Sequence, residues 1–143
     1  MKAVLAWLPA ALAVAGAALV GAAAFLPWRI VTGGSGADVG TTDTGGTPAI
    51  VLGAAALAVG VWLAWRKATI GQAGMALLVG VLIFLVEVLG FYVTAYGAAL
   101  AKVSSEGGPG VLTSFMSSIL MVAAGYIRTA QACAARPRAS GPH

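Results

Sequence analysis

Long apolar segments separated by short polar connections dominate the pattern of the chain. They cover residues 4–26, 48–65, 73–96 and 111–127. Each is close to the roughly 20 residues with which a helix crosses a hydrocarbon layer about 30 Å thick. Because lipid offers no hydrogen bonds to an exposed backbone, we expect helices, and the alternation typical of barrel strands is not seen. The pattern predicts an all-α integral membrane protein with one four-helix transmembrane domain over residues 1–130.

The connections predict how these helices are arranged. The joint at residues 66–70 is short, so the second and third segments should be antiparallel neighbours. Residues 28–47 are rich in Gly, Thr, Ser and Asp, and their β-favouring start followed by glycines fits either a small hairpin or a disordered loop. Residues 99–110 contain a Ser-Ser-Glu-Gly-Gly-Pro run, which indicates a helix end and a turn. We expect an antiparallel bundle with a short outer loop.

The distribution of positive charge predicts the orientation of the bundle. Cytoplasmic loops carry an excess of Lys and Arg. With both termini inside, only Arg29 and Lys102 lie outside, and the other six cations lie inside: Lys2, Arg66, Lys67, Arg128, Arg136 and Arg138. We therefore expect an N-in, C-in protein of a bacterial inner membrane, with a disordered basic cytoplasmic tail over residues 131–143.

Composition strengthens the membrane prediction and narrows the partners. Hydrophobic residues make up 60% of the chain and charged residues only 8%, against about 25% charged in ordinary soluble domains. The net charge of +4 comes from cations scattered near segment ends, so we expect no nucleic-acid partner. Five residues at segment ends are candidate anchors at headgroup depth: Trp28, Arg29, Trp65, Arg66 and Lys67.

A secretory signal is an alternative for the first segment. Lys2 supplies a charged start, and Ala22-Ala23-Ala24 resembles a small-residue cleavage site. The apolar stretch is longer than the usual core of about 7–15 residues in such signals. Its length favours a retained membrane helix.

Candidate catalytic residues are few. The sole histidine, His143, is the last residue, and Cys133 is the only cysteine. Residues 33–37 approach a nucleophile elbow, but alanine replaces its last glycine. Asp38 and Asp43 lack the ligand spacing of a helix-loop-helix calcium site. We expect a protein that is not an enzyme and has no catalytic, cofactor or metal site.

Glu87 is the exception to the apolar pattern. It lies near the middle of the third segment, where a charged side chain costs about 3 kcal/mol on insertion scales. A neutral, protonated carboxyl would lower that cost. Small and polar residues recur on the same helical face and on the fourth segment, at spacings of three and four: Gly80, Ile83, Gly90, Thr94 and Gly97 in the third, and Ser114, Ser118, Met121 and Gly125 in the fourth.

Three interpretations of Glu87 remain open. It locks the bundle by hydrogen bonding to the Ser114 or Ser118 hydroxyl, to nearby Thr113 or Ser117, or to a backbone carbonyl. It belongs to a proton- or ion-linked transport path. In the third interpretation, it contacts a partner subunit.

Short motifs give the chain two resemblances. The first segment ends in Phe25-Leu26-Pro27-Trp28 before a Gly/Thr/Asp-rich loop, and Arg66-Lys67 closes the second. This resembles the small four-pass membrane proteins common in actinobacteria, most of which have no assigned activity. Leu26-Pro27-Trp28-Arg29-Ile30 is similar, more weakly, to the first-helix end of claudins. The cysteine pair and Trp-Gly-Leu-Trp element of that family are missing, so the resemblance implies four-pass topology and no paracellular function.

These observations favour a non-catalytic accessory or scaffold subunit of a bacterial membrane complex. It would work through helix packing and an outer-loop binding surface. The expected partners are the lipid bilayer and either other membrane subunits or further copies of the chain. The alternative is a small transporter or channel component that uses Glu87.

Overall fold

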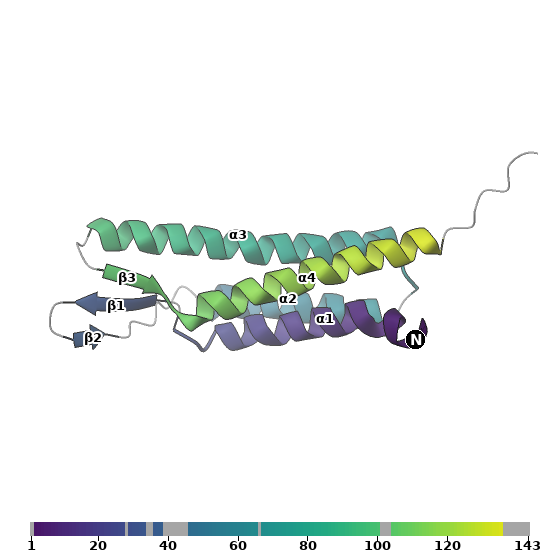
Figure 1. Cartoon of the computed structure of the whole chain (residues 1–143), viewed down its shortest axis with the longest axis horizontal. Coiled ribbons are helices and arrows are strands. Elements are labelled where there is room, and N and C mark those ends of the chain that lie inside the picture. The colour runs from purple at the N-terminus through teal and green to yellow at the C-terminus, as the bar shows by residue number, and fades with distance from the viewer. Residues whose placement is uncertain are drawn as a thin grey trace, which may run out of the picture.

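The computed structural model describes residues 2–27, 29–33, 36–38, 46–65, 67–100 and 104–135. Within these residues, four helices are each long and apolar enough to cross a membrane, as predicted. The helices lie side by side, and three short strands lie beyond one end of them (Figure 1). The elements are α1 (Lys2–Ala23), β1 (Arg29–Gly33), β2 (Gly36–Asp38), α2 (Gly46–Trp65), α3 (Ile70–Leu100), β3 (Ser104–Gly107) and α4 (Pro109–Ala134).

The two ends of the bundle differ in what they carry. At one end α1 begins, α4 ends and α2 passes into α3, and we call this the termini end (Figure 1). The strands lie at the opposite end, which we call the sheet end. Successive helices therefore run in opposite directions, as expected from the short joint between α2 and α3.

Several helix boundaries differ from the predicted ones, among them both ends of α3, which covers Ile70–Leu100 instead of residues 73–96. Helix α1 ends at Ala23 instead of residue 26, and a tight turn follows in which the Phe25 amide bonds to the Ala22 carbonyl at 3.0 Å. Pro27 explains the early end, because a proline disfavours helical backbone in the residue before it. The Pro27 carbonyl instead accepts a hydrogen bond from the Gly110 amide at 3.1 Å, which joins the end of α1 to the start of α4.

Helix α4 is longer than predicted. It continues past residue 127 to Ala134, so a disordered tail cannot start at residue 131. Residues 136–143 of that predicted tail lie outside the described residues. The prediction stopped at the charge of Arg128, which the fold accommodates inside the bundle.

A three-stranded sheet caps the sheet end. Strands β1 and β2 form the antiparallel hairpin that the sequence allowed, with Gly33 opposite Gly36. Strand β3, for which only a turn was predicted, pairs antiparallel with the other edge of β1, with Arg29 opposite Gly107. This pairing joins segments about 75 residues apart, so local sequence patterns carry no signal for it.

Helices α1 and α4 are the central packing elements, because α4 contacts both α1 and α3, and α1 contacts both α4 and α2. Small residues permit these contacts. A Cβ on Gly60 of α2 would lie 3.0 Å from Val14 of α1, and one on Gly16 of α1 would lie 3.2 Å from the Ser117 carbonyl of α4. The core is built largely of alanines, whereas large side chains such as Leu57 and Leu89 are 48% and 66% exposed. This distribution suits a bundle surrounded by lipid.

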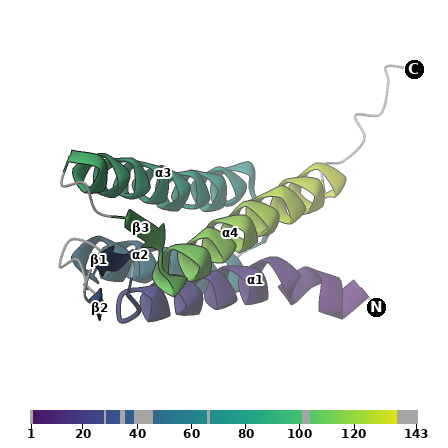
Figure 2. The ribbon, with the colours of Figure 1, turned by 60° about the vertical axis from the view of Figure 1, so that its left-hand side comes forward.

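Helices α3 and α4 touch closely near the termini end and separate toward the sheet end, as Figures 1 and 2 both show. A Cβ on Gly125 would lie 2.7 Å from Leu77, and one on Gly80 would lie 2.9 Å from Val122. Farther along α3, a Cβ on Gly90 would meet nothing within 4 Å. The pair therefore forms a wedge that is open on the side of the sheet.

Candidate functional site

Glu87 lies within this wedge. Its side chain is only 4% exposed, yet neither carboxyl oxygen accepts a hydrogen bond from any residue that the structure describes. Ser114 of α4 is placed as a hydrogen-bond donor toward the carboxyl, but its geometry falls short of a complete hydrogen bond to either oxygen. A buried polar group without a partner is costly, by about 1–3 kcal/mol, and is rare in native structures.

Of the predicted hydroxyl partners, Ser114 is therefore the one that the structure brings to the carboxyl. The other predicted hydroxyls of α4 donate elsewhere. Ser117 bonds to the Gly16 carbonyl of α1 at 2.7 Å, and Ser118 bonds to the Phe115 carbonyl of its own helix at 2.7 Å. Thr113 bonds within α4, to Pro109 and Gly110. Backbone carbonyls compete with Glu87 for these hydroxyls, within the same helix for Thr113 and Ser118 and on α1 for Ser117.

The Glu87 carboxyl borders a hollow between α3 and α4 with a volume of about 590 Å³. This volume falls within the range of roughly 300–1,000 Å³ of ligand pockets, which are mainly apolar with a few placed polar groups. Glu87 is the only charged residue among its described lining residues. The other lining residues are Phe84, Val88, Phe91, Tyr92, Gly108, Val111, Leu112 and Phe115.

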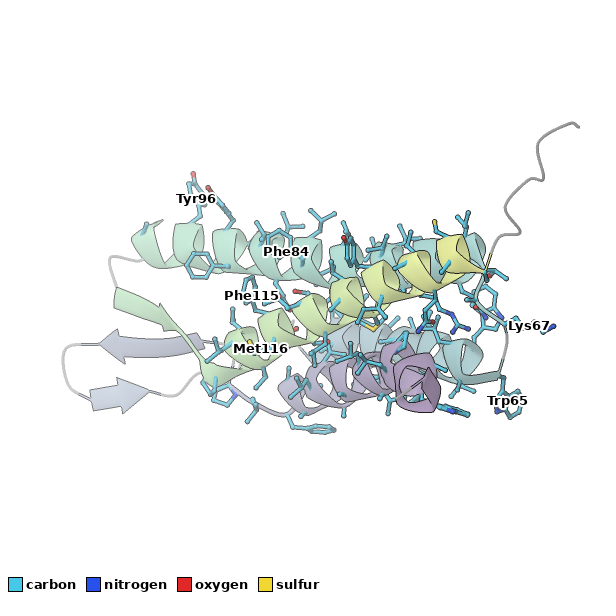
Figure 3. All side chains as sticks on the ribbon, turned by 45° about the vertical axis from the view of Figure 1, so that its right-hand side comes forward. Trp65, Lys67, Phe84, Tyr96, Phe115 and Met116 are labelled. Atoms are coloured by element: carbon cyan, nitrogen blue, oxygen red, sulfur yellow. The ribbon has the colours of Figure 1, made fainter. Side chains whose placement is uncertain are left out.

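A second hollow continues along the same two helices toward the termini end. It measures about 540 Å³ and shares Phe84 and Phe115 with the first. Their rings meet across the helix pair with centroids 6.0 Å apart, and Figure 3 shows the two side chains reaching from α3 and α4 toward the same place. Its remaining lining residues are Gly80, Val81, Ser118, Ile119, Val122, Ala123 and Tyr126. We call the two hollows together the Glu87 groove.

The other buried ionisable side chain, Arg128 of α4, is fully engaged. It is 5% exposed, and its guanidinium donates to Gln72 Oε1 at 2.9 and 3.1 Å and to the Leu63 carbonyl at 3.0 Å. A further bond joins it to Gln131 at 3.1 Å. Gln72, 1% exposed, donates in turn to the Trp62 carbonyl at 3.2 Å. This Arg128 cluster ties the ends of α2, α3 and α4 together.

Sequence reasoning missed the Arg128 cluster. It counted Arg128 as a loop charge and did not single out Gln72. One signal was available, since Gln72 and Arg128 are polar residues near the edges of apolar segments, two residues from the start of α3 and six residues from the end of α4. Pairing them required knowing that α3 and α4 are antiparallel neighbours.

The remaining candidate residues fall into separate places. Ser114 and Ser118 are buried on the face of α4 toward α3, and Gly80 packs there against Met121 and Val122. Gly90 makes no such close approach, because the helices have already separated. Thr94 lies in α3, with its side chain outside the described set.

The candidate anchors are only partly described. Trp65 is 84% exposed and lies with Lys67 at the termini end, as Figure 3 shows, whereas Tyr96 lies toward the sheet end of α3. Arg29 begins β1, and its side chain is not described. Trp28 and Arg66 lie outside the described residues.

Comparisons with known proteins add no family. No protein-family model matches the chain, and no curated protein sequence matches it. The resemblances to small actinobacterial four-pass proteins and to claudins therefore stay predictions. The Glu87 groove is therefore the feature of the chain that bears on its function.

Proposed function

We propose that this protein is a non-catalytic accessory subunit of a membrane complex, and that the Glu87 groove is its docking face for another subunit. The single observation that carries the proposal is Glu87, a residue of an apolar groove whose buried carboxyl accepts no complete hydrogen bond from the described residues. A partner that supplies a hydrogen-bond donor would remove the cost of that orphaned group, whereas lipid tails cannot.

The exposed surface of α3 supports the same proposal. Of the four apolar helices, α3 has the smallest share of its span buried in the bundle, 28% against 33% to 39% for the others. Aromatic side chains gather on it, including Phe91 at 52% and Tyr92 at 71% exposure. Aromatic residues are enriched at the cores of protein interfaces, so this helix is the best candidate for a subunit contact.

The orientation belongs to the same proposal. Lys67, the start of α1 and the end of α4 lie at the termini end. The cations that flank these helix ends favour the cytoplasm, so the sheet would lie on the outer side of a bacterial inner membrane. The predicted outer-loop binding surface would then be formed by the sheet. The side chains of the sheet lie outside the described set.

Site-specific photocrosslinking tests the accessory role. A photoreactive phenylalanine analogue at Val88, in the groove, should crosslink one defined membrane protein in native membranes. The matched control is the analogue at Leu57 of α2, which is 48% exposed and lies outside the groove. Lipid adducts alone from both positions, together with a lone monomer in mild detergent, would count decisively against an accessory role.

Proton- or ion-linked transport is the second candidate, and the buried carboxyl favours it too. A transport path differs from a docking groove because polar side chains must line it for the ion. The described lining of the Glu87 hollow is otherwise apolar or aromatic, which favours a docked apolar partner over a hydrated ion. Proteoliposomes separate the two, because a transporter shows pH-dependent flux that Glu87→Gln alters.

A further inference from the structure

We infer that the Glu87 groove receives a single transmembrane helix of the partner, and that this helix carries a basic side chain seven residues from a bulky apolar one. The basic side chain would enter the hollow beside Glu87, and the apolar one would enter the second hollow. The inference rests on the accessory role proposed above and specifies the chemistry of the partner.

The spacing of the two hollows matches a helix. Val88 and Leu112 line the first hollow, and Val81 and Ile119 line the second, so each of α3 and α4 supplies two lining residues seven positions apart, one to each hollow. Seven residues of helix rise about 10 Å. Side chains seven residues apart lie on one face of a helix and enter successive holes of a neighbour, as in coiled-coil packing.

The two hollows also open on one face of the helix pair. Val81, Phe84 and Val88 follow steps of three and four along α3 and are 47%, 42% and 37% exposed. Leu112, Phe115 and Ile119 do the same on α4, at 65%, 41% and 47%. The Phe84 and Phe115 rings, with centroids 6.0 Å apart, form the ridge between the hollows. One straight helix lying over this ridge can fill both.

The chemistry of the first hollow selects a cationic donor. Neither oxygen of the Glu87 carboxyl completes a hydrogen bond with the described residues, and Phe84, Phe91 and Phe115 line the same hollow. A Lys or Arg side chain would pair with the carboxylate, and aromatic rings attract the same cations. Two opposite charges are buried together at far lower cost than either alone.

The cations whose side chains the structure describes are poor candidates for supplying that charge from a second copy of the chain. Among side chains that the structure describes, the cations are Lys67 and Arg128. Arg128 is committed to Gln72, Leu63 and Gln131. Lys67 lies at the termini end. Glu87 lies toward the opposite end, six residues or about 9 Å from the end of the α3 span at Val93, so the two side chains are at different depths along the bundle.

Synthetic transmembrane peptides test the inference directly. The probe is a Leu/Ala helix of about 24 residues, long enough to span the bilayer, with Lys about six residues from one end and Phe seven residues farther on. Energy transfer between the labelled peptide and the labelled full chain, in phosphatidylethanolamine and phosphatidylglycerol vesicles, reports association. We expect the Lys peptide to associate about 3- to 20-fold more tightly than its Leu counterpart, the range of measured interhelical polar contacts.

Variants of the chain locate the contact. Glu87→Gln should remove most of the preference for Lys, and Ala123→Phe, which fills the second hollow, should weaken both peptides equally. Leu85→Phe is the matched control, since Leu85 is 54% exposed and lines neither hollow. A peptide with the Lys-to-Phe distance cut from seven residues to five should bind no better than the Leu peptide.

Four results would overturn the inference. They are equal binding of Lys and Leu peptides, no effect of Glu87→Gln, Glu87-dependent binding of dodecylamine without any peptide binding, and self-association of the chain that Glu87→Gln abolishes. The last two would assign the groove to a small amphiphile or to a second copy. If position 88 crosslinks to a protein but the peptides fail to bind, only the inference of a basic partner helix is rejected. If no protein crosslink forms, the accessory role itself is rejected.

Discussion

Arg128 and Glu87 are both ionisable side chains buried on the contact between α3 and its neighbours, but their surroundings are opposite. Arg128, near the termini end, donates hydrogen bonds to Gln72, to Gln131 and to the Leu63 carbonyl. Glu87, in the wedge toward the sheet end, accepts none from the described residues. The helices are in close contact at the first place and have separated at the second.

The difference separates a structural role from a docking role. Burying a charge is tolerated where its hydrogen bonds are complete, and Arg128 meets that condition within the chain alone. Glu87 does not meet it with the described residues, and for this reason we propose that a group from outside the chain completes its hydrogen bonds. Burial by itself would have ranked the two residues equally, at 5% and 4% exposure.

Removing the arginine is expected to have the largest effect. Arg128→Leu leaves Gln72 Oε1 and the Leu63 carbonyl without their donors, and we expect the free energy of unfolding to fall by about 2–4 kcal/mol. Reversible unfolding in mixed micelles, followed by circular dichroism, measures it. Arg128→Lys should recover only part of the loss, because an ammonium group cannot reproduce the guanidinium fork. An unchanged stability of Arg128→Leu would show that the cluster is not structural.

Enlarging a glycine tests the close end of the α3 and α4 contact. Gly125→Val places atoms where a Cβ alone would lie 2.7 Å from Leu77, so we expect a loss of about 1–3 kcal/mol from overpacking. Gly90→Ala is the control at the open end and should stabilise by up to about 1 kcal/mol, since alanine is the better helix former. Equal effects of the two substitutions would contradict the wedge.

Removing the carboxyl should have the opposite sign to removing the arginine. Glu87→Leu eliminates the unpaired buried group, and we expect the isolated chain to gain about 1–2 kcal/mol in free energy of unfolding. The same micelle experiment measures it. A loss of stability comparable with that of Arg128→Leu would mean that Glu87 has a structural partner within the chain.

The smallest effect is expected at an ordinary interhelical bond. Ser117→Ala removes the 2.7 Å bond to the Gly16 carbonyl of α1, and membrane double-mutant cycles suggest a loss of about 0.6 kcal/mol. Ser118→Ala, whose hydroxyl bonds within α4, should cost less. Reversible unfolding in mixed micelles measures both losses, and Ser118→Ala serves as the matched control for the bond between helices. The opposite ranking would show that the contact between α1 and α4 does not depend on this bond.

Much of the fold followed from the pattern of apolar residues. The four helices, the antiparallel joint between α2 and α3 and the option of a hairpin at β1 and β2 were all predicted, because each depends on residues close together in the chain. Strand β3 and the last turns of α4 were not. The first requires a partner strand far away in sequence, and the second requires Gln72 to satisfy Arg128.

The candidate site was predicted in part. A single glutamate in an apolar span is evident from the sequence, so Glu87 was identified without a structure. The hydrogen bonding of Glu87 was not predicted, because the Ser117 and Ser118 hydroxyls donate to backbone carbonyls instead of to the carboxyl. The groove was likewise invisible, since no residue spacing reports the angle at which two helices cross.

By itself, the sequence determined that this chain forms apolar helices of membrane-spanning length and that Glu87 would be an anomaly among them, because hydrophobicity and its period are local properties of the chain. Only the tertiary structure decided which buried charge is satisfied and which is left open. Hydrogen-bond completion depends on which atoms from distant segments meet. In this bundle, hydrogen-bond acceptors from distant segments meet the Arg128 guanidinium. The wedge between α3 and α4 leaves the Glu87 carboxyl without a complete hydrogen bond from the described residues.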